Sequence, residues 1–437
     1  MRSDKRGEGR GVAFPAAFFC MACVAAALFQ AFPARGEEAV RTLTLEECLA
    51  LSEANHPDLA GADAKREAER RRLSLTAVED RVQASANASA ARSGREGAPS
   101  GSSYTAGVTA SVRVFDANRT KYAVEAQRGT LAATEAEGRK TRLQVRYGVK
   151  KAYMDLLLAG EVRGQRKESV DSFRLHLERA KGYYETGLKP KSDVTKAEVD
   201  LGNAQLALVE AESNVRVAQA ALLNAMGVDL DGPFEVRAED RALPESAEGG
   251  AEALALEHRQ DYEAANRRTL AGKAEVRSAA RASSPNLSLR GGYSAGGEEI
   301  SSLSSEWNVG LSLNVPVVDG GAASARTDIA RAQVRSLEAA REALRQNILL
   351  EVRKAVLNIR NARERIRIAG LTVAQAEENY SLAEGRYRTG VGDSLALSDA
   401  LLALTDARLS VYRARYDLQV AQFALESATG VELTEPE

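Results

Sequence analysis

The sequence contains few of the residues that build compact cores and reactive sites. Only 5% of its 437 residues are aromatic, and it has 10 prolines, 3 cysteines, 3 histidines and 1 tryptophan. Because aromatic side chains supply much of the buried area of ordinary cores, their scarcity argues against the two or three compact domains that the length alone suggests. Few histidines and cysteines leave little material for a metal site. With 59 basic and 61 acidic residues, the chain is not a strongly basic nucleic-acid binder.

Alanine, leucine and valine are abundant instead, among evenly mixed charges, and 44% of the residues are hydrophobic and 27% charged. This composition is typical of long helices that pack closely together. No run of 18 or more apolar residues occurs after the N-terminal segment, so any insertion into a membrane is expected to use strands.

Residues 1–36 predict a secretory signal peptide. Basic residues precede an apolar stretch at 12–32, and the small residues Ala34 and Gly36 stand at positions −3 and −1 before the expected cleavage site. The alternatives are a retained membrane anchor and, less favoured because apolar residues continue after Cys23, a lipoprotein. Cleavage would leave Cys48 as the one remaining cysteine, so the exported chain is expected to have no disulfide framework.

The remainder of the chain is an internal duplication. A shift of 203 positions, without gaps over roughly 170 residues, pairs Lys151-Ala152 with Lys354-Ala355, Thr186-Gly187 with Thr389-Gly390, and Gly227 with Gly430. We therefore expect a first repeat at 37–228, a connector with little structure of its own at 229–250, and a second repeat at 251–437.

Each repeat is predicted to begin with a helical stretch and to continue as two strands. The clearest strand, 104–114, alternates apolar residues with small or polar ones, and its copy at 307–317 does the same. The other expected segments are helices at 45–78 and 252–280, weaker strands near 82–90 and 287–293, and loops at 93–102 and 294–303.

The clear strands fit a bilayer better than the alternative, a small soluble hairpin packed on a core. Tyr104 and Trp307 occupy the same repeat position at the start of the apolar band, where aromatics of a membrane interface belong. Two strands per repeat give four per chain. Four strands cannot close a barrel with a usable lumen, so several chains are expected to share one barrel.

Long helices follow the strands. The segment 117–185 and its copy 322–388 contain no proline, and each corresponds to a rod about 100 Å long. Asp116 and Asp319 are the expected N-caps. After each long helix the chain turns, and a return helix carries apolar residues at a 3.5-residue period over four heptads, which predicts a coiled-coil seam.

This arrangement resembles the TolC-like family of outer-membrane efflux proteins. The resemblance rests on the duplicated halves, two strands per half, proline-free helices, and the Tyr-x-Thr-Gly pattern at both turns. It implies a mainly α fold with membrane β structure. In that fold four strands from each protomer of a homotrimer close a 12-stranded β-barrel, which a 12-helix periplasmic α-barrel continues.

The resemblance also implies an exit duct in the outer membrane of a Gram-negative cell, extending into the periplasm. Such a duct passively exports small molecules or polypeptides in a tripartite efflux or type I secretion system, and it needs no cofactor. It contacts outer-membrane lipid, a periplasmic adaptor and, through the adaptor, an inner-membrane pump, while drugs, metal ions and polypeptides all stay open as cargo. The implied adaptor-docking tips are Thr186, Gly187, Leu188, Thr389, Gly390 and Val391.

Family members close the tunnel near these tips with inward aspartates and a small Asp/Arg/Tyr network. Here Asp193, Tyr387 and Asp399 match positions of that periplasmic gate. Gly392 stands where an arginine would pair with Asp193, and Ala396 replaces a second inward aspartate. We therefore expect a weakly latched gate with at most one aspartate per chain in its ring.

Two other classes of protein are alternatives to a channel. A soluble periplasmic scaffold or adaptor built on helical hairpins would show the same seam, but it would not explain the attached strands. An enzyme has almost no support, because His56, His176 and His258 are scattered without ligand spacing and no nucleophile elbow or phosphate loop is present. No catalytic, cofactor-binding or metal-binding residue is therefore predicted.

Overall fold

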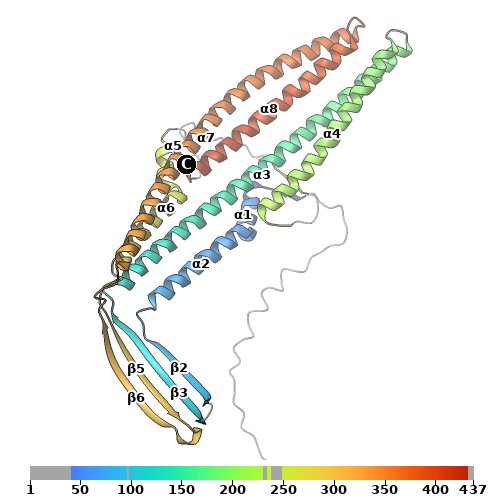
Figure 1. The fold of residues 1–437 in the computed structure, drawn as a ribbon. Helices are drawn as coiled ribbons and strands as arrows, with labels where there is room; N and C mark the ends of the chain where they lie inside the picture. Colours follow the sequence, from blue (N-terminus) through green and yellow to red (C-terminus); the bar gives the residue numbers. More distant parts are fainter. Residues whose placement is uncertain (1–40, 96–97, 230–233, 238–248, 432–437) are drawn as a thin grey trace, which may run out of the picture.

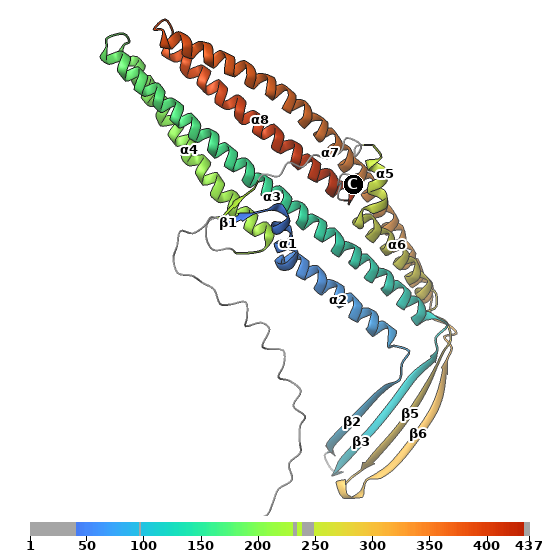
Figure 2. The same ribbon diagram turned by 180° about the vertical axis from the view of Figure 1, so that it is seen from behind.

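The computed structural model describes residues 41–95, 98–229, 234–237 and 249–431. The molecule is elongated, with a four-stranded sheet at one end and the turns of two long helical hairpins at the other (Figures 1 and 2). The predicted signal peptide lies outside the described residues. Among the helices of the described parts, none has the length and apolar character needed to cross a membrane.

The helical stretch at the start of each repeat is two helices rather than the single one expected. The four helices are α1 (Leu45–Asn55), α2 (Pro57–Ala77), α5 (Ala251–His258) and α6 (Gln260–Ala279). In the first repeat the break has a clear cause, because a residue that precedes proline is forced away from the helical region, and His56 is extended before Pro57. In the second repeat Arg259 is extended in the same way without a proline, so nothing local in the sequence marks this break.

The two hairpins have the same lengths in both repeats. The long helices α3 (Arg119–Glu185) and α7 (Ala322–Arg388) each contain 67 residues, and the return helices α4 (Lys191–Met226) and α8 (Ser394–Thr429) each contain 36. The seam prediction is confirmed, because its alanines and leucines in α4 and α8 are buried or half-buried. Small side chains let helix axes approach closely, which accounts for the alanine-rich composition.

The predicted N-caps need a correction. The α3 and α7 helices begin at Arg119 and Ala322, and the residues that directly precede them, Asn118 and Gly321, have left-handed backbones. The aspartates nevertheless accept the first free amides. Asp116 Oδ2 lies 2.7 Å from the amide nitrogen of Thr120, and Asp319 Oδ2 lies 2.8 Å from that of Ala323.

The sheet has the order β2-β3-β5-β6, and all its pairings are antiparallel. Its strands are β2 (Gln83–Arg95), β3 (Ala98–Phe115), β5 (Asn286–Gly297) and β6 (Ser304–Asn314). The expected loop at 93–102 is mostly strand, so β2 and β3 extend further than predicted. Conversely, β6 ends before residue 317, because Pro316 has no amide hydrogen for a ladder bond.

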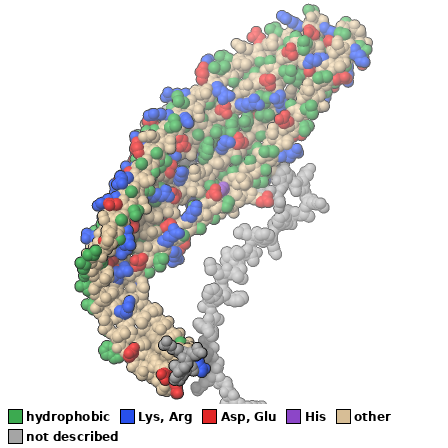
Figure 3. All heavy atoms as spheres, in the orientation of Figure 1, with side chains coloured by type: hydrophobic (Ala, Val, Ile, Leu, Met, Phe, Trp, Pro, Cys, Tyr) green, Lys and Arg blue, Asp and Glu red, His purple; other side chains and the backbone are tan. Residues whose placement is uncertain are grey.

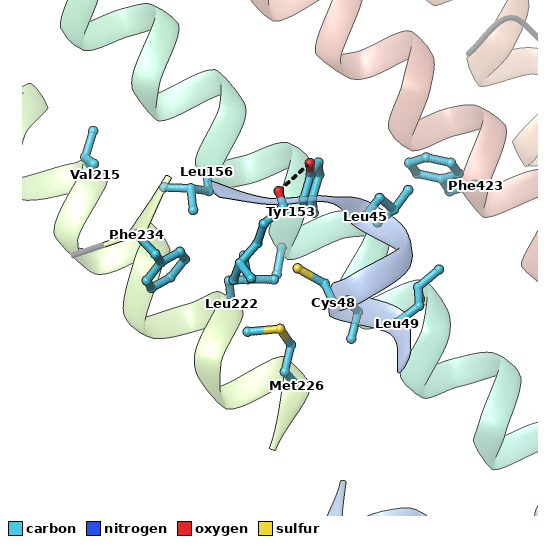
Figure 4. Packing of buried hydrophobic residues seen from close by; sticks show 13 residues of the cluster. Leu45, Cys48, Leu49, Tyr153, Leu156, Val215, Leu222, Met226, Phe234 and Phe423 are labelled. Atoms are coloured by element: carbon cyan, nitrogen blue, oxygen red, sulfur yellow. Dashed lines mark hydrogen bonds between the residues drawn. The ribbon is translucent and has the colours of Figure 1, made fainter. Parts of the chain in front are cut away.

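A compact core lies where α1, α3 and α4 of the first repeat meet the connector, and Phe423 of α8 also packs into it (Figure 4). Here β1 (Arg41–Leu43) pairs in parallel with β4 (Phe234–Val236), so the connector at 229–250 contains a strand that was not expected. The buried Tyr153 hydroxyl donates to the carbonyl of Arg237 at 2.6 Å and fixes this small sheet to α3. Burial raises the pKa of the neighbouring Cys48 thiol to about 11, which makes it an unreactive packing residue.

Candidate functional site

The two hairpin turns form matching exposed ends. At each turn a threonine hydroxyl donates to carbonyls of the preceding helical turn, Thr186 to Gly182 and Thr389 to Gly385. The next residue is a left-handed glycine, Gly187 at φ 75° and Gly390 at φ 80°. A side chain in this backbone region is strained, so glycine is needed for the turn itself.

Each turn then presents one apolar side chain. Leu188 is 70% exposed and Val391 is 86% exposed, which is unusual for large apolar side chains. The six predicted tip residues therefore lie together at one end of the molecule, three on each hairpin (Figure 1).

Polar contacts join the two turns side by side. Lys189 Nζ donates to the carbonyl of Gly392 at 2.7 Å, and the Tyr183 hydroxyl donates to the carbonyl of Arg388 at 3.2 Å. Further from the tips, Arg179 forms an ion pair with Glu384 at 2.7 Å. The hairpins of the two repeats are thus connected near their ends through residues that belong to different repeats.

Tyr387, one of the predicted gate residues, is buried between the hairpins. It is 1% exposed, and its ring packs edge-on against His176 and Tyr183 of α3 at centroid distances of 5.2 and 5.6 Å. The pKa of the Tyr387 hydroxyl is raised, mainly by burial and to a smaller extent by the negative charge of nearby Asp193. The structure therefore brings Tyr387 and Asp193 together, whereas Asp399 lies on an exposed part of α8.

Gly392 is constrained by its surroundings. A Cβ added to it would lie 2.6 Å from the amide nitrogen of Tyr387 and 2.8 Å from the carbonyl carbon of Arg386, closer than real contacts allow. An arginine could not occupy this backbone without a shift of the chain. A cation is supplied from the other hairpin instead, because Lys189 Nζ lies 5.8 Å from the centre of the Tyr387 ring.

A buried polar cluster lies below the turns and was not predicted from the sequence. His176 of α3, Asp200 of α4, and Ser394 and Ser398 of α8 are all less than 7% exposed. The Ser398 hydroxyl donates to Asp200 Oδ2, and His176 Nε2 lies 3.2 Å from Ser394 Oγ. The sequence did contain one signal, because all four positions differ between the repeats. The counterparts of His176, Asp200, Ser394 and Ser398 are Asn379, Ala403, Lys191 and Thr195.

The sheet has one apolar and one polar face. On one face, cross-strand rows join Val108 to Tyr293 and Tyr293 to Trp307. On the other face the hydroxyls of Ser85 and Thr109 lie 3.0 Å apart. The exposed apolar face has the character of a lipid-facing surface, and Figure 3 shows how few charged side chains this end carries compared with the helices.

The two predicted interface aromatics differ in their position along the sheet. Tyr104 lies opposite Gly297, whereas Trp307 lies opposite Tyr293, four residues away on the same strand. The outer edges of β2 and β6 have no strand beside them among the described residues. The four strands form an open sheet whose edges remain available for pairing.

Within the described residues, no group of three or more histidine, cysteine or carboxylate side chains could hold a metal ion. Two of the three histidines lie outside any buried polar network. His56 caps α2 by accepting the amide of Asp58, and His258 is exposed at the end of α5. His176 is the one that enters a buried network.

Comparison with known proteins places this geometry in a family. Residues 49–228 and 253–431 each match the family described as outer membrane efflux protein. The outer membrane protein OprJ of Pseudomonas aeruginosa is 30% identical over 210 residues, which are 46% of this chain and 44% of OprJ. The aligned stretch thus spans less than half the length of that relative. The cation efflux system protein CusC of Escherichia coli O157:H7 is 25% identical over 369 residues, 79% of this chain and 77% of CusC.

Solved structures share the fold. A crystal structure of CusC superposes with a TM-score of 0.81 at 21% identity, covering 92% of this chain and 96% of CusC. The CmeC outer membrane channel of Campylobacter jejuni gives a TM-score of 0.79 at 19% identity, covering 90% of this chain and 87% of that one.

Proposed function

The chain belongs to the outer membrane efflux protein family, and from that membership we propose that it is the exit duct of a tripartite efflux or type I secretion system. Members of this family are outer-membrane channel proteins and not enzymes. The proposed duct is passive. It receives small molecules or polypeptides from a periplasmic adaptor and an inner-membrane pump and releases them across the outer membrane.

One observation carries this proposal: a four-stranded sheet with an apolar and a polar face continues directly into two long helical hairpins. Backbone groups at open sheet edges cannot remain unpaired in lipid, so β2 and β6 require strands from other copies. Three chains would supply twelve strands and a barrel wide enough for a lumen. Tyr104 and Trp307 are proposed to lie at the membrane interface.

The periplasmic end is proposed to be both the gate and the docking site. Leu188 and Val391 are exposed apolar side chains at the ends of the hairpins, which suits contact with an adaptor. Asp193 and Tyr387 are proposed to help close the tunnel, and Asp399 to contribute one carboxylate per chain to a ring that favours cations.

Oligomeric state and membrane location test the duct itself. We expect the full-length protein to fractionate with the outer membrane and to run as an SDS-resistant trimer that dissociates on heating. A monomer in the soluble periplasmic fraction would exclude the proposal and favour a soluble hairpin scaffold.

Crosslinking tests the docking tips. A cysteine at Leu188, which is 70% exposed, should capture a periplasmic adaptor in cells, while a cysteine at the exposed Leu75 of α2 should not. Gly392 is unsuited to this experiment, because a Cβ there collides with the backbone of Tyr387. Equal capture from both positions would contradict docking at the tips.

The carboxylate ring is tested by conductance. Removal of three negative charges by Asp399→Ala should reduce cation selectivity of single channels in lipid bilayers. Glu378→Ala, a change of the same charge on α7, is the control, and an unchanged selectivity of Asp399→Ala would remove Asp399 from the ring.

A further inference from the structure

The buried cluster below the turns joins three helices of both hairpins. The Asp200 carboxylate of α4 accepts from Lys196 Nζ at 2.5 Å through Oδ1 and from the Ser398 hydroxyl of α8 through Oδ2. His176 of α3 contacts Ser394 of α8 and the ring of Tyr387. Opening of the hairpin ends would break the contacts of both serines with the first hairpin.

An apolar contact between the same two hairpins lies next to the cluster, on its side away from the turns. Val170 and Phe173 of α3, Ala204 of α4 and Leu401 of α8 form one buried group. The polar cluster is therefore shielded from water both by this group and by Tyr387, which is 1% exposed. Hydrogen bonds in such a shielded place are costly to leave unmade, so they favour one arrangement of the helices.

We propose that His176, Asp200, Ser394 and Ser398 form a clasp that holds the second hairpin closed against the first, and that protonation of His176 releases it. The clasp rests on the proposed function, because it assumes that the hairpin ends close the duct. It differs from the gate of Asp193, Tyr387 and Asp399 in its residues and in its response to pH.

The position of His176 explains why protonation would release the clasp. The Nδ1 atom of the ring is buried and has no hydrogen-bond partner among the described residues. Protonation would place a second N–H donor and a positive charge at this position. The new donor would have no acceptor among the described residues. Burial disfavours the charge more than the nearby carboxylates favour it, so protonation favours movement of the hairpins toward water.

The charges that face His176 act in opposite directions. Burial is the largest influence and lowers the pKa of His176, and the charges of Arg179 on α3 and Lys196 on α4 lower it further. Asp200 and Asp193, both on α4, act to raise it. From α7 the imidazole faces the ring of Tyr387, and from α8 the hydroxyl of Ser394. The net shift is downward.

The direction of the pH effect follows from this shift. In an open state that exposes His176 to water, its pKa would return toward about 6.5. Between that value and the lower pKa of the closed state, the open state binds a proton that the closed state does not. The closed state is therefore expected to lose stability as the pH falls below about 6.5.

Thiol labelling tests the clasp on the full-length protein reconstituted in lipid. Leu401→Cys in a Cys48→Ala background places a thiol in the apolar contact between the hairpins, and Leu188→Cys provides an exposed reference thiol. The ratio of the two labelling rates removes the intrinsic effect of pH on thiol reactivity. We expect this ratio to rise as the pH falls from 7.5 to 5.5, by up to roughly tenfold for each pH unit between the two pKa values of His176.

Three variants then separate the clasp from general destabilisation. His176→Gln should give a ratio that does not change with pH, while His258→Gln, at an exposed histidine, should behave like the parent. Ser398→Ala should raise the ratio about tenfold at every pH, because Asp200 loses a buried hydrogen bond. Thr195→Ala, at the equivalent exposed position of the first repeat, should leave it unchanged.

Two results would overturn the clasp: a pH response that survives in His176→Gln, or equal ratios for Ser398→Ala and Thr195→Ala. Labelling requires neither conductance nor a partner. A protein that labels as expected but never conducts in bilayers would retain the clasp and lose the proposed function. A conducting protein whose labelling ignores His176 would retain the function and lose the clasp.

Discussion

The α3–α4 and α7–α8 hairpins share one backbone plan but differ in what they bury. Their helices have equal lengths, and their turns and C-caps use left-handed glycines at equivalent positions. Yet Tyr387 is 1% exposed while its repeat counterpart Tyr184 is 46% exposed. The duplication therefore supplies the helical frame, and a few divergent residues decide which surfaces of the two hairpins meet.

A second pair of equivalent residues shows the same divergence. Lys150 of α3 and Glu426 of α8 form an ion pair at 2.6 Å in which both side chains are 5% exposed. The counterpart of Lys150 is Arg353, whose contact with Glu252 is open to water. The Lys150–Glu426 pair therefore joins the two repeats inside the protein, whereas the Arg353–Glu252 pair lies on the surface of the second repeat.

The largest expected effect comes from breaking that buried pair. Lys150→Met should lower the free energy of unfolding by about 3–5 kcal/mol, because it leaves a carboxylate buried in the core. Arg353→Met should have little effect, since an exposed ion pair contributes little. Denaturant titration in detergent, followed by circular dichroism, measures both, and equal losses would show that the two environments do not differ as described.

Substitution at the C-caps tests the shared frame. Gly227→Ala should destabilise the protein by about 3 kcal/mol, from left-handed strain together with a Cβ that would lie 2.8 Å from His56 Cα. Gly430→Ala should behave similarly, because its Cβ would lie 3.1 Å from the His258 carbonyl oxygen. Gly187→Ala, left-handed but in open space, should cost only about 1 kcal/mol in the same titration. A larger loss at Gly187 than at Gly227 would contradict the packing around the caps.

The two repeats are also expected to differ at Asp261 and its counterpart Asp58 in how stability depends on pH. Burial acts to raise the pKa of Asp261, but hydrogen bonds and charge from Arg259 and Lys140 outweigh it, so the pKa is lowered. A lowered carboxylate pKa contributes stability above the unfolded value near 3.9, and that stability is lost as the pH falls through the folded value. Asp261→Asn should cost about 2 kcal/mol at pH 7 and less below pH 4. Asp58→Asn, at the exposed counterpart, is the control in the same unfolding titrations, and an equal loss in the two variants at pH 7 would contradict the difference in burial.

The smallest effect is expected at the tips. Lys189→Ala removes the hydrogen bond to Gly392 and the cation beside Tyr387, which should favour separation of the turns by about 1 kcal/mol, or roughly fivefold. Lys191→Ala, at an exposed lysine two residues away, is the control. Labelling of Leu401→Cys measures the separation, and identical rates in the two variants would exclude Lys189 as a link between hairpins.

The sequence predicted the features that depend on local pattern. Absence of proline defined α3 and α7 to within two residues, and period-2 alternation located β3 and β6. Features that depend on distant partners were missed. The strand β4 forms because Phe234–Val236 meets β1 almost 200 residues away, and a three-residue segment carries no pattern of its own.

The buried cluster was missed for the same reason. Asp200 and Ser398 are 198 positions apart, and each alone is an ordinary polar residue of a helix. His176 likewise stands nine residues before the end of α3 without any neighbouring motif. Only the packing of one hairpin on the other shows that these side chains are withdrawn from water.

The stagger of the two predicted interface aromatics has a consequence for the width of the proposed barrel. Tyr104 and Trp307 lie two strands apart and are offset by four residues along β5. If both sit at one depth in the bilayer, the strands must lean about 55° from the membrane normal, given ~3.4 Å per residue and ~4.8 Å between strands. This is steeper than the typical 35–45°, and for a fixed number of strands it widens a barrel by roughly a third relative to a 40° lean. If the proposed barrel forms, the offset between these two copies of one strand would set the bore through which cargo leaves.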